Sequence, residues 1–447
     1  MAIRFILIEL THYHYLCLQL YLLIMLPIQL FRTNKELILQ GLKKKNFKEP
    51  ELVGKIIEAD ERRRQLQVEN DNLAAIVNSA SKSIGRHMAK GEKEEAELLK
   101  EKVGLHKEQV KHIAQKLSDL ETELQDMMVR LPNLPHSSVP TGKTPDDNEV
   151  VREGGEFPDL SAQKLPHWGL TAKYGLVDFE LGNKITGAGF PVFMGQGARL
   201  QRALINYFLN YNIDAGYKEY CPPFMVNETS AYGTGSLPDK EGQMYHVTED
   251  NLYLIPTAEV PVTNVYRDTI IQENELPVKM TAYSPCFRRE AGSYGKDVRG
   301  LNRVHQFDKV EIVQLVNPAA SYNALEEMLA HVERLLKALG LPYRILRLCG
   351  GDMTFASALT YDFEVYSAGQ ERWLEVSSVS NFETFQTNRM KIRYKDGSGK
   401  TQLVHSLNGS SLALPRIMAS LLENNQTPEG IKIPGVLVPY FGKELIG

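Results

Sequence analysis

Cysteine is scarce in this sequence, and its spacing argues against the common metal and disulfide frameworks. The 447 residues include only Cys17, Cys221, Cys286 and Cys349, and no two of them form a C-x-x-C pair. Structural zinc sites and disulfide scaffolds depend on closely spaced cysteines. We therefore expect no zinc, and we expect the reducing environment of a cytoplasmic protein.

Two common nucleotide-binding motifs are also absent. Neither G-x-G-x-x-G nor G-x-x-x-x-G-K-[ST] occurs, so a Rossmann or P-loop site is not supported. Neither sign of charge dominates, because 51 Lys and Arg face 55 Asp and Glu for a net charge of −4. Any contact with a nucleic acid must therefore come from local patches.

Charge is missing from one stretch near the N-terminus, residues 10–31, which contains no Asp, Glu, Lys or Arg. About 20 apolar residues can span a bilayer, but this run also contains His12, His14, Gln19 and Pro27. Three interpretations stay open: translation that begins at Met25, an added apolar helix, or membrane targeting. We expect residues 1–24 to be extraneous and the chain to have no membrane partner. Mass spectrometry of the native N-terminus distinguishes the three.

Proline is absent between Pro50 and Pro132, and this segment shows helical heptads. Apolar residues recur in alternating steps of three and four, which is typical of a coiled-coil seam. They are Ala59, Leu66, Leu73, Val77, Ala80 and Ile84, then Leu99, Val103, Val110, Ile113, Leu117, Leu120, Leu124, Met127 and Leu131. Gly85 and Gly91 bracket the segment where we expect the chain to reverse direction. The pattern predicts an antiparallel helical arm within residues 25–131, and composition leaves a plain dimerisation or spacer coiled coil open.

The rest of the chain reads as a linker followed by one mixed domain. Residues 132–165 are rich in Pro, Gly and Asp, which indicates a linker. In residues 166–447, adjacent strand-like runs without helices between them predict an α+β domain with an antiparallel sheet. The strand-like runs are 279–287, 304–316, 373–379 and 390–394, and the helical runs are 197–213, 319–339 and 412–423.

Four short segments carry residues suited to chemistry. Two apolar runs, 278–287 and 304–315, flank a loop whose base carries Arg288, Arg289, Glu290 and Arg303. Guanidinium groups bind phosphate oxygens in bidentate fashion. Taken singly, however, these arginines would be ordinary surface charges at strand ends.

The other three segments are weaker signals by themselves. The turn at 408–410 leads into a helix that carries Arg416, and a helix N-terminus can bind anions, although Asn408 or Ser410 could simply cap the helix. The loop IPTAEVPVTN, residues 255–264, offers a carboxylate at Glu259. The run E-V-S-S, residues 375–378, supplies oxygen ligands of the kind that Mg²⁺ prefers.

Together these segments resemble a known family. The run FRREAGSYG…RGLNRVHQFDKVE resembles motif 2 of the seryl-tRNA synthetases, which are class II aminoacyl-tRNA synthetases. LNGSSLALPRIMASLLE resembles motif 3 and residues 187–227 resemble motif 1, all in the family's order. The resemblance extends from about Met25 to the C-terminus. It implies a class II antiparallel-sheet catalytic domain preceded by an arm that lies across a tRNA.

The resemblance also implies an activity. Serine and ATP would form seryl-adenylate with release of pyrophosphate, and the seryl group would then pass to the 3′-terminal ribose of tRNA(Ser). Selenocysteine tRNA, tRNA(Sec), stays open as a second substrate. The motif 1 region would form a homodimer, and Mg²⁺ would be the metal.

Site residues follow from the same resemblance. Arg288 and Arg416 would be catalytic, and Glu375 and Ser378 would hold Mg²⁺. The ATP site would comprise Arg288, Arg289, Glu290, Arg303, Val304, Phe307, Glu375, Val376, Ser377, Ser378 and Arg416. The serine site would comprise Thr257, Ala258, Glu259, Arg288, Glu311, Asn408 and Ser410.

Three rival interpretations fit the sequence less well. A ligase that loads amino acids onto carrier proteins would typically lack the arm. A non-catalytic protein with the same fold would be expected to lose some of Arg288, Glu290, Phe307, Glu375 and Arg416, all of which are present. The scattered cysteines and the matching motif 2 do not favour a zinc-dependent variant.

Overall fold

The computed structural model describes residues 26–160, 164–239, 242–290 and 299–447. The interpretations of residues 1–24 therefore lie outside the described residues. So does the tip of the loop whose base carries Arg288 and Arg303. The chain forms two compact units, one ending at Pro132 and one extending from Asn133 to Gly447, and each is described by itself.

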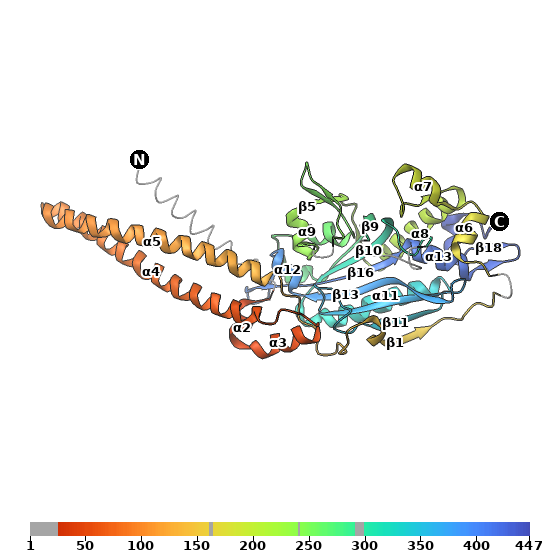
Figure 1. Ribbon diagram of the computed structural model, residues 1–447, viewed down its shortest axis with the longest axis horizontal. Coiled ribbons are helices and arrows are strands. Elements are labelled where there is room, and N and C mark those ends of the chain that lie inside the picture. Colours follow the sequence, from red (N-terminus) through yellow and green to blue (C-terminus); the bar gives the residue numbers. More distant parts are fainter. Residues whose placement is uncertain (1–25, 161–163, 240–241, 291–298) are drawn as a thin grey trace. The chain divides into compact units, whose positions relative to one another are not determined.

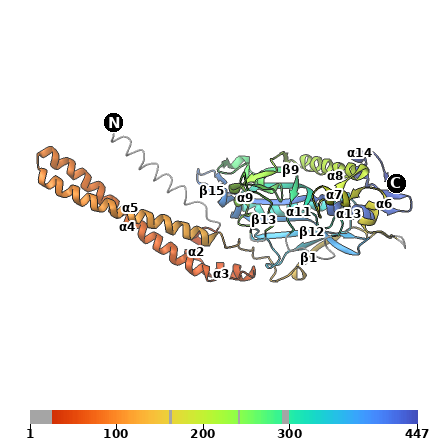
Figure 2. The same cartoon turned by 45° about the horizontal axis from the view of Figure 1, so that its top comes forward.

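The first unit is a helical hairpin. Short helices α2 (Ile28–Thr33) and α3 (Lys35–Lys44) precede two long ones, α4 (Leu52–Lys90) and α5 (Lys93–Met128), which run side by side in Figures 1 and 2. Gly91 ends α4 in the left-handed conformation, at a φ of 82°, which glycine adopts without steric cost. The predicted antiparallel arm is confirmed, except that α4 continues through Gly85 and reverses only after Lys90.

Burial in the arm is concentrated at one end of the hairpin. The buried side chains of α4 lie between Leu52 and Arg63, and most of those of α5 lie between Ile113 and Met128. Asp60, 2% exposed, accepts hydrogen bonds there from Arg32 at 2.7 and 2.8 Å and from Arg63 at 3.0 Å. Towards the turn the two helices share only a narrow seam, because a pair of helices cannot enclose a wider core.

The second unit is built on an eight-stranded sheet. Its order is β1-β11-β12-β13-β16-β10-β9-β4. All neighbours are antiparallel except β4 and β9, which confirms the predicted antiparallel sheet. The strands are β1 (Glu149–Gly154), β4 (Lys218–Glu219), β9 (Val278–Phe287), β10 (Gln306–Val316), β11 (Tyr343–Arg347), β12 (Leu359–Ser367), β13 (Arg372–Glu383) and β16 (His405–Ala413).

The two faces of this sheet differ, because side chains alternate along each strand. In β10, Val310 and Ile312 join a core that includes Met328 of α11 (Ser321–Ala338) and Phe208 of α8 (Gly195–Asp214). The helix α13 (Leu414–Asn424) packs into the same core through Ile417. The intervening residues of β10 lie on the other face, called the polar face here, where Lys309 and Glu311 are polar. Further along the strand on this face, Val313 and Leu315 pack with Met280 in a second core.

Smaller elements surround the sheet. Two three-stranded sheets, β15-β14-β8 and β5-β7-β6, and short helices α9 (Glu228–Thr234), α10 (Glu259–Asn264) and α12 (Phe385–Arg389) lie close to the polar face. Their strands are β5 (Met225–Asn227), β6 (His246–Val247), β7 (Leu252–Leu254), β8 (Ile270–Gln272), β14 (Arg393–Lys395) and β15 (Thr401–Leu403). The remaining α-helices and strands of the described residues are α6 (His167–Lys173), β2 (Val177–Asp178), α7 (Phe179–Ile185), β3 (Val192–Phe193), β17 (Gln426–Thr427), β18 (Gly430–Lys432), α14 (Val438–Phe441) and β19 (Leu445–Ile446).

Three local expectations differ from the structure. The linker assigned to 132–165 contains strand β1, which pairs with β11 at the edge of the sheet. The turn expected at 408–410 lies inside β16 instead, since the helix begins only at Leu414. The strand expected over 390–394 begins at Arg393, because Met390 ends helix α12. Among the described residues, no helix is long and apolar enough to cross a membrane.

Candidate active site

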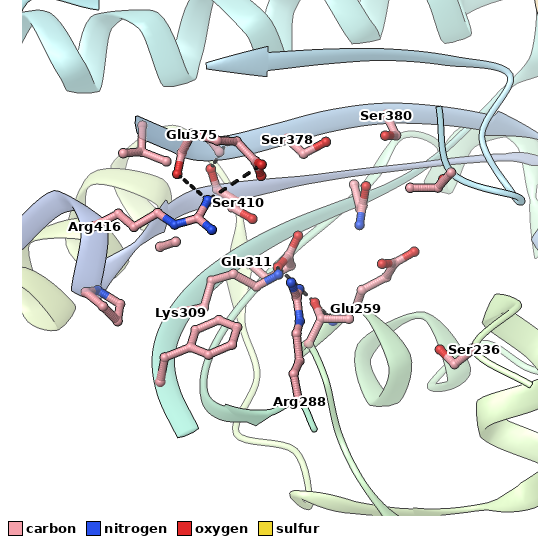
Figure 3. A pocket seen from close by; sticks show the side chains of 18 of the residues that line it. Ser236, Glu259, Arg288, Lys309, Glu311, Glu375, Ser378, Ser380, Ser410 and Arg416 are labelled. Carbon is pink, nitrogen blue, oxygen red and sulfur yellow. Dashed lines mark hydrogen bonds and ion pairs between the residues drawn. The ribbon is translucent and has the colours of Figure 1, made fainter. Parts of the chain in front are cut away.

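A cavity of about 420 Å³ lies on the polar face of the sheet. Its walls come from the base of the β9–β10 loop, from the strands β10, β13 and β16, and from the start of α13. Figure 3 shows Arg416 and Glu375 at one end of this cavity and Ser236 at the other, with Arg288 and Glu311 between them.

Most of the predicted site residues line this single cavity. They are Thr257, Glu259, Arg288, Glu290, Arg303, Val304, Phe307, Glu311, Glu375, Val376, Ser377, Ser378, Asn408, Ser410 and Arg416. Arg289 and Ala258 are not among its lining residues. Arg289 has an exposed side chain and a backbone N–H that donates to Gln243 O at 2.8 Å. Ala258 is fully buried just before α10.

One end of the cavity carries a guanidinium held in a fixed position. Arg416 lies in the first turn of α13, where its Nε donates to Asn302 O at 2.9 Å and its Nη1 donates to Glu375 O at 2.8 Å. The same Nη1 lies 3.6 Å from the Glu375 carboxylate. These contacts tie together α13, β13 and the base of the β9–β10 loop. They hold a permanent cation beside a carboxylate that still reaches the cavity.

A second guanidinium lies in the middle of the cavity. Arg288 follows the last residue of β9, and its N–H donates to His305 O at 2.9 Å, which holds the base of the loop together. Its guanidinium carbon lies 5.1 Å from the centre of the Phe307 ring. Glu290 adopts a φ of 50° and accepts a hydrogen bond from Arg303 at 3.0 Å. Two cations, an aromatic face and a carboxylate are therefore grouped at the loop base.

A buried charged cluster forms the floor of the cavity. Glu311 is 1% exposed, and its Oε2 accepts hydrogen bonds from Thr257 Oγ1 at 3.0 Å and lies 2.6 Å from Lys309 Nζ. Lys309 itself is 6% exposed. Because a buried charge is costly unless it is paired, Lys309 compensates the carboxylate of Glu311. Ser410 lies directly opposite Glu311 in the neighbouring strand β16.

A second carboxylate, Glu259, stands at the start of α10. Its Oε1 accepts a hydrogen bond from Gln386 Nε2 at 2.6 Å. Burial, reinforced by the like charge of Glu311, raises the pKa of Glu259 to about 7, while the amides of Gln386 and Asn408 and the charge of Lys309 act in the opposite direction. Near neutral pH this carboxyl is therefore poised between its two protonation states, and a nearby ammonium ion would favour the ionised one.

The comparisons with known proteins agree with this geometry. Residues 245–425 match the tRNA synthetase class II core domain (G, H, P, S and T), and residues 25–135 match the seryl-tRNA synthetase N-terminal domain. The serine–tRNA ligase of Salinibacter ruber is 49% identical over 425 residues, which cover 95% of this chain and 99% of the relative. This chain belongs to the seryl-tRNA synthetase family.

Further relatives of the seryl-tRNA synthetase family cover nearly the whole chain as well. The serine–tRNA ligase of Methylacidiphilum infernorum is 46% identical over 94% of this chain and 100% of its own length. The crystal structure of seryl-tRNA synthetase from Pyrococcus horikoshii complexed with ATP superposes with a TM-score of 0.89 and 32% identity, over 94% of this chain and 99% of that one.

Oxygen donors suited to a magnesium ion lie at one edge of the cavity. Among the described residues, no group of three or more His, Cys, Asp or Glu side chains is arranged to hold a metal ion. Glu375 and Ser378 supply one carboxylate and one hydroxyl from β13, a donor set that fits Mg²⁺, which usually keeps water and phosphate oxygens as its other ligands. Burial and the nearby Glu375 raise the pKa of Asp362, on β12 opposite Ser378, well above its ordinary value.

Several cavity residues were missed by sequence analysis. Lys309 could have been found, because it stands two residues before Glu311 in a strand and therefore faces the same way. Asn302 contributes only a backbone oxygen to Arg416, which no sequence pattern reveals. The walls at 234–236 and 354–356 come from loops remote in sequence from the recognised motifs.

Glu259 gives a prediction for stability. A raised carboxyl pKa means that the folded chain binds the proton more tightly than the unfolded chain, so the stability from this group is complete below about pH 4.5 and is lost as pH rises towards 7. Glu259→Gln removes this pH-dependent loss of stability, because a glutamine side chain does not ionise. We expect the substrate-free variant to gain about 3 kcal/mol in free energy of unfolding at pH 8 and almost nothing at pH 4.5, as measured by chemical denaturation.

The matched control is Glu249→Gln, which neutralises an exposed carboxylate in the same domain. It should leave the free energy of unfolding unchanged at both pH values. An equal gain for Glu259→Gln at pH 4.5 and pH 8 would contradict the assignment, because the gain would then not arise from titration.

Proposed function

We propose that this chain attaches L-serine to tRNA(Ser) in two steps, forming seryl-adenylate from ATP with release of pyrophosphate and then transferring the seryl group to a hydroxyl of the 3′-terminal ribose with release of AMP. The observation that carries the proposal is the division of one cavity into two ends. Arg288, Arg416 and Phe307 offer two cations and a ring, which suit a nucleotide. The buried pair Glu311 and Lys309 suits a small polar amino acid.

The cations act on the phosphates of ATP. In the first step the serine carboxylate attacks the α-phosphorus and pyrophosphate leaves. Displacement at phosphorus asks the protein mainly for positioning and for neutralisation of charge. Arg288, in the middle of the cavity, holds the α-phosphate and the serine carboxylate together. Arg416, fixed by Asn302 and Glu375, takes the γ-phosphate.

The base of ATP fits the loop base between β9 and β10. Phe307 offers one ring face, and base–aromatic stacking contributes roughly 1–3 kcal/mol. The Glu290 carboxylate can accept from an exocyclic amino group, and Arg303 already holds it in place at 3.0 Å. Arg289 enters only through its backbone, because its side chain is exposed away from the cavity lining.

Serine fits the floor of the cavity. Its hydroxyl needs both donor and acceptor partners, which the paired residues Glu311 and Ser410 can supply from adjacent strands. Its ammonium group pairs with Glu259, and Thr257 and Asn408 complete the polar wall. A site built to bond a hydroxyl rejects alanine strongly, because alanine leaves the buried groups unpaired.

Mg²⁺ completes the nucleotide end. Glu375 and Ser378 would hold it, and when bound it would neutralise charge on the ATP phosphates. Arg416, 3.6 Å from the Glu375 carboxylate, orients that carboxylate.

The assembly follows from the remaining regions. The arm binds tRNA through the shape and backbone of the RNA more than through its sequence, and tRNA(Sec) is the second candidate substrate.

The motif 1 region, with α8 and exposed Ile213, Phe224 and Met225, forms the homodimer interface. Light scattering should give twice the 50.5 kDa of one chain, and a monomer would contradict the dimer.

Serine specificity is tested by Glu311→Ala. The variant loses a partner of the serine hydroxyl and leaves Lys309 without its carboxylate. We expect the serine KM to rise about 100-fold, which corresponds to the roughly 1–3 kcal/mol lost with such a buried partner, while the ATP KM changes less than about threefold. Serine-dependent ATP–pyrophosphate exchange measures both constants.

The control is Gln314→Ala, a buried polar residue of the same strand that bonds Tyr217 at 2.7 Å, away from the cavity. Its two KM values should stay near those of the unmodified chain. An unchanged serine KM in Glu311→Ala would refute the assignment of the serine end.

The two-domain division is tested by shortening the arm. Removing about residues 72–111 and closing the helices with a Gly-containing turn keeps the packed end around Asp60. The unmodified chain should catalyse serine-dependent exchange and charge tRNA(Ser), with tRNA(Sec) tested beside it. The shortened chain should keep the exchange and lose the charging. Loss of both reactions would contradict separable units, and charging of a carrier protein instead of tRNA would favour the rival ligase.

A further inference from the structure

A buried glutamine lies directly behind the serine end of the cavity. Gln386, 1% exposed, belongs to the five-residue helix α12 and is not itself a lining residue. Its Nε2 donates to Glu259 Oε1 at 2.6 Å and to Thr234 O at 3.1 Å, and its Oε1 accepts from Ser406 Oγ at 2.8 Å. One amide thus contacts three separate elements, α10, α9 and β16.

The partners fix which way this amide faces. A backbone carbonyl can only accept, so the oxygen of Thr234 requires the nitrogen of Gln386 on its side. The same nitrogen then meets Glu259, and the amide oxygen is left to the hydroxyl of Ser406. The side chain therefore cannot turn over without breaking contacts on both sides, and its donor stays directed at the carboxylate.

Thr234 links the amide to the cavity wall. It is the last residue of α9, after which Gly235 turns the chain at a φ of 92° and Ser236 lines the cavity. Gln386 consequently joins a carboxylate of the serine end to the wall that faces it. A change at Gln386 would move both.

We propose that Gln386 is a positioning residue for serine: its amide holds the Glu259 carboxylate against the α9 wall, so that the carboxylate is placed and charged to receive the substrate ammonium. The inference rests on the proposed function and extends it by one residue. Gln386 acts only through Glu259 and touches no substrate.

The surroundings of Glu259 explain why such a donor is needed. From β10 the charged groups Glu311 and Lys309 face it, with opposite effects, and from β16 the neutral amide of Asn408 bonds it. Burial and Glu311 favour the protonated form, which cannot pair with an ammonium. The hydrogen bond from Gln386 favours the ionised form.

The plain alternative is that Gln386 only stabilises the packing of α12. In that case its loss would lower stability and affect the serine and ATP sites alike. Positioning predicts a selective effect on serine and a change in its pH dependence.

The decisive variant is Gln386→Met, which keeps the length of the side chain and removes the donor. In serine-dependent ATP–pyrophosphate exchange at pH 7.5, the serine KM should rise about 10-fold or more while the ATP KM changes less than about twofold. The acid limb of kcat/KM for serine should move to higher pH by about one unit, because the pKa of Glu259 rises when a hydrogen bond to its ionised form is lost.

The matched control is Thr387→Val. Thr387 is equally buried on the same helix, and its hydroxyl donates to Val404 O at 2.6 Å, away from Glu259. It should lower stability to a similar extent without moving either KM or the acid limb. If Gln386→Met behaves as Thr387→Val does, the positioning role is overturned.

A milder variant covers the case in which Gln386→Met does not fold. Ser406→Ala frees the amide oxygen of Gln386 and should raise the serine KM about two- to fivefold at constant ATP KM; an unchanged serine KM overturns the inference.

Failure of the proposed function can be distinguished from failure of this inference. If the unmodified chain shows no serine-dependent exchange, the proposed function fails and this inference with it. If it shows exchange and the variants keep its serine KM, only the role of Gln386 fails.

Discussion

The site depends on the two-residue period of three adjacent strands, β10, β13 and β16. On one face their apolar residues pack against α8, α11 and α13, as Val310 and Ile312 do. The residues between them, Glu311 in β10 and Ser410 in β16, must then point to the opposite face, where they meet as direct neighbours. The core therefore fixes the register that brings these polar groups together. A shift of β10 by one residue would turn its apolar side chains towards the cavity and its polar side chains into the core.

Burial of charge is the second constraint, and the chain meets it by pairing. Glu311 is compensated by Lys309, whereas Glu259 has amide donors and, within the described part of the chain, no directly bonded cation. Burial raises the pKa of Glu259 to about 7. A carboxyl that is costly to ionise in the free protein gains most when a cationic ligand arrives. The raised pKa of Glu259 therefore lowers the stability of the free protein above neutral pH, and the binding of a cationic ligand offsets that loss.

Sequence patterns predicted the arm and the β9–β10 hairpin correctly, because both depend on local periodicity and resemble contiguous family motifs. The predictions were wrong where contacts between residues remote in sequence determine the structure. Residues 408–410 look like a turn, since Asn-Gly-Ser is a typical turn sequence, yet pairing on both sides makes them strand. Residues 132–165 look like a linker because strand β1 is short and exposed at a sheet edge. Gln386 lies in no recognised motif, and only the fold brings it to Glu259.

Another buried carboxylate, Glu423, lies near the far end of α13. This helix carries Arg416 near its start and Glu423 near its end, and Glu423 accepts hydrogen bonds from His167 at 2.7 and 2.8 Å and from Gln370 at 3.0 Å. Burial would raise the pKa of Glu423, but the hydrogen bonds from His167 and Ser367 lower it below its ordinary value. Gln370 in turn accepts a hydrogen bond from Asn302, whose carbonyl holds Arg416. A buried anion at one end of the helix thus helps to place a cation at the other.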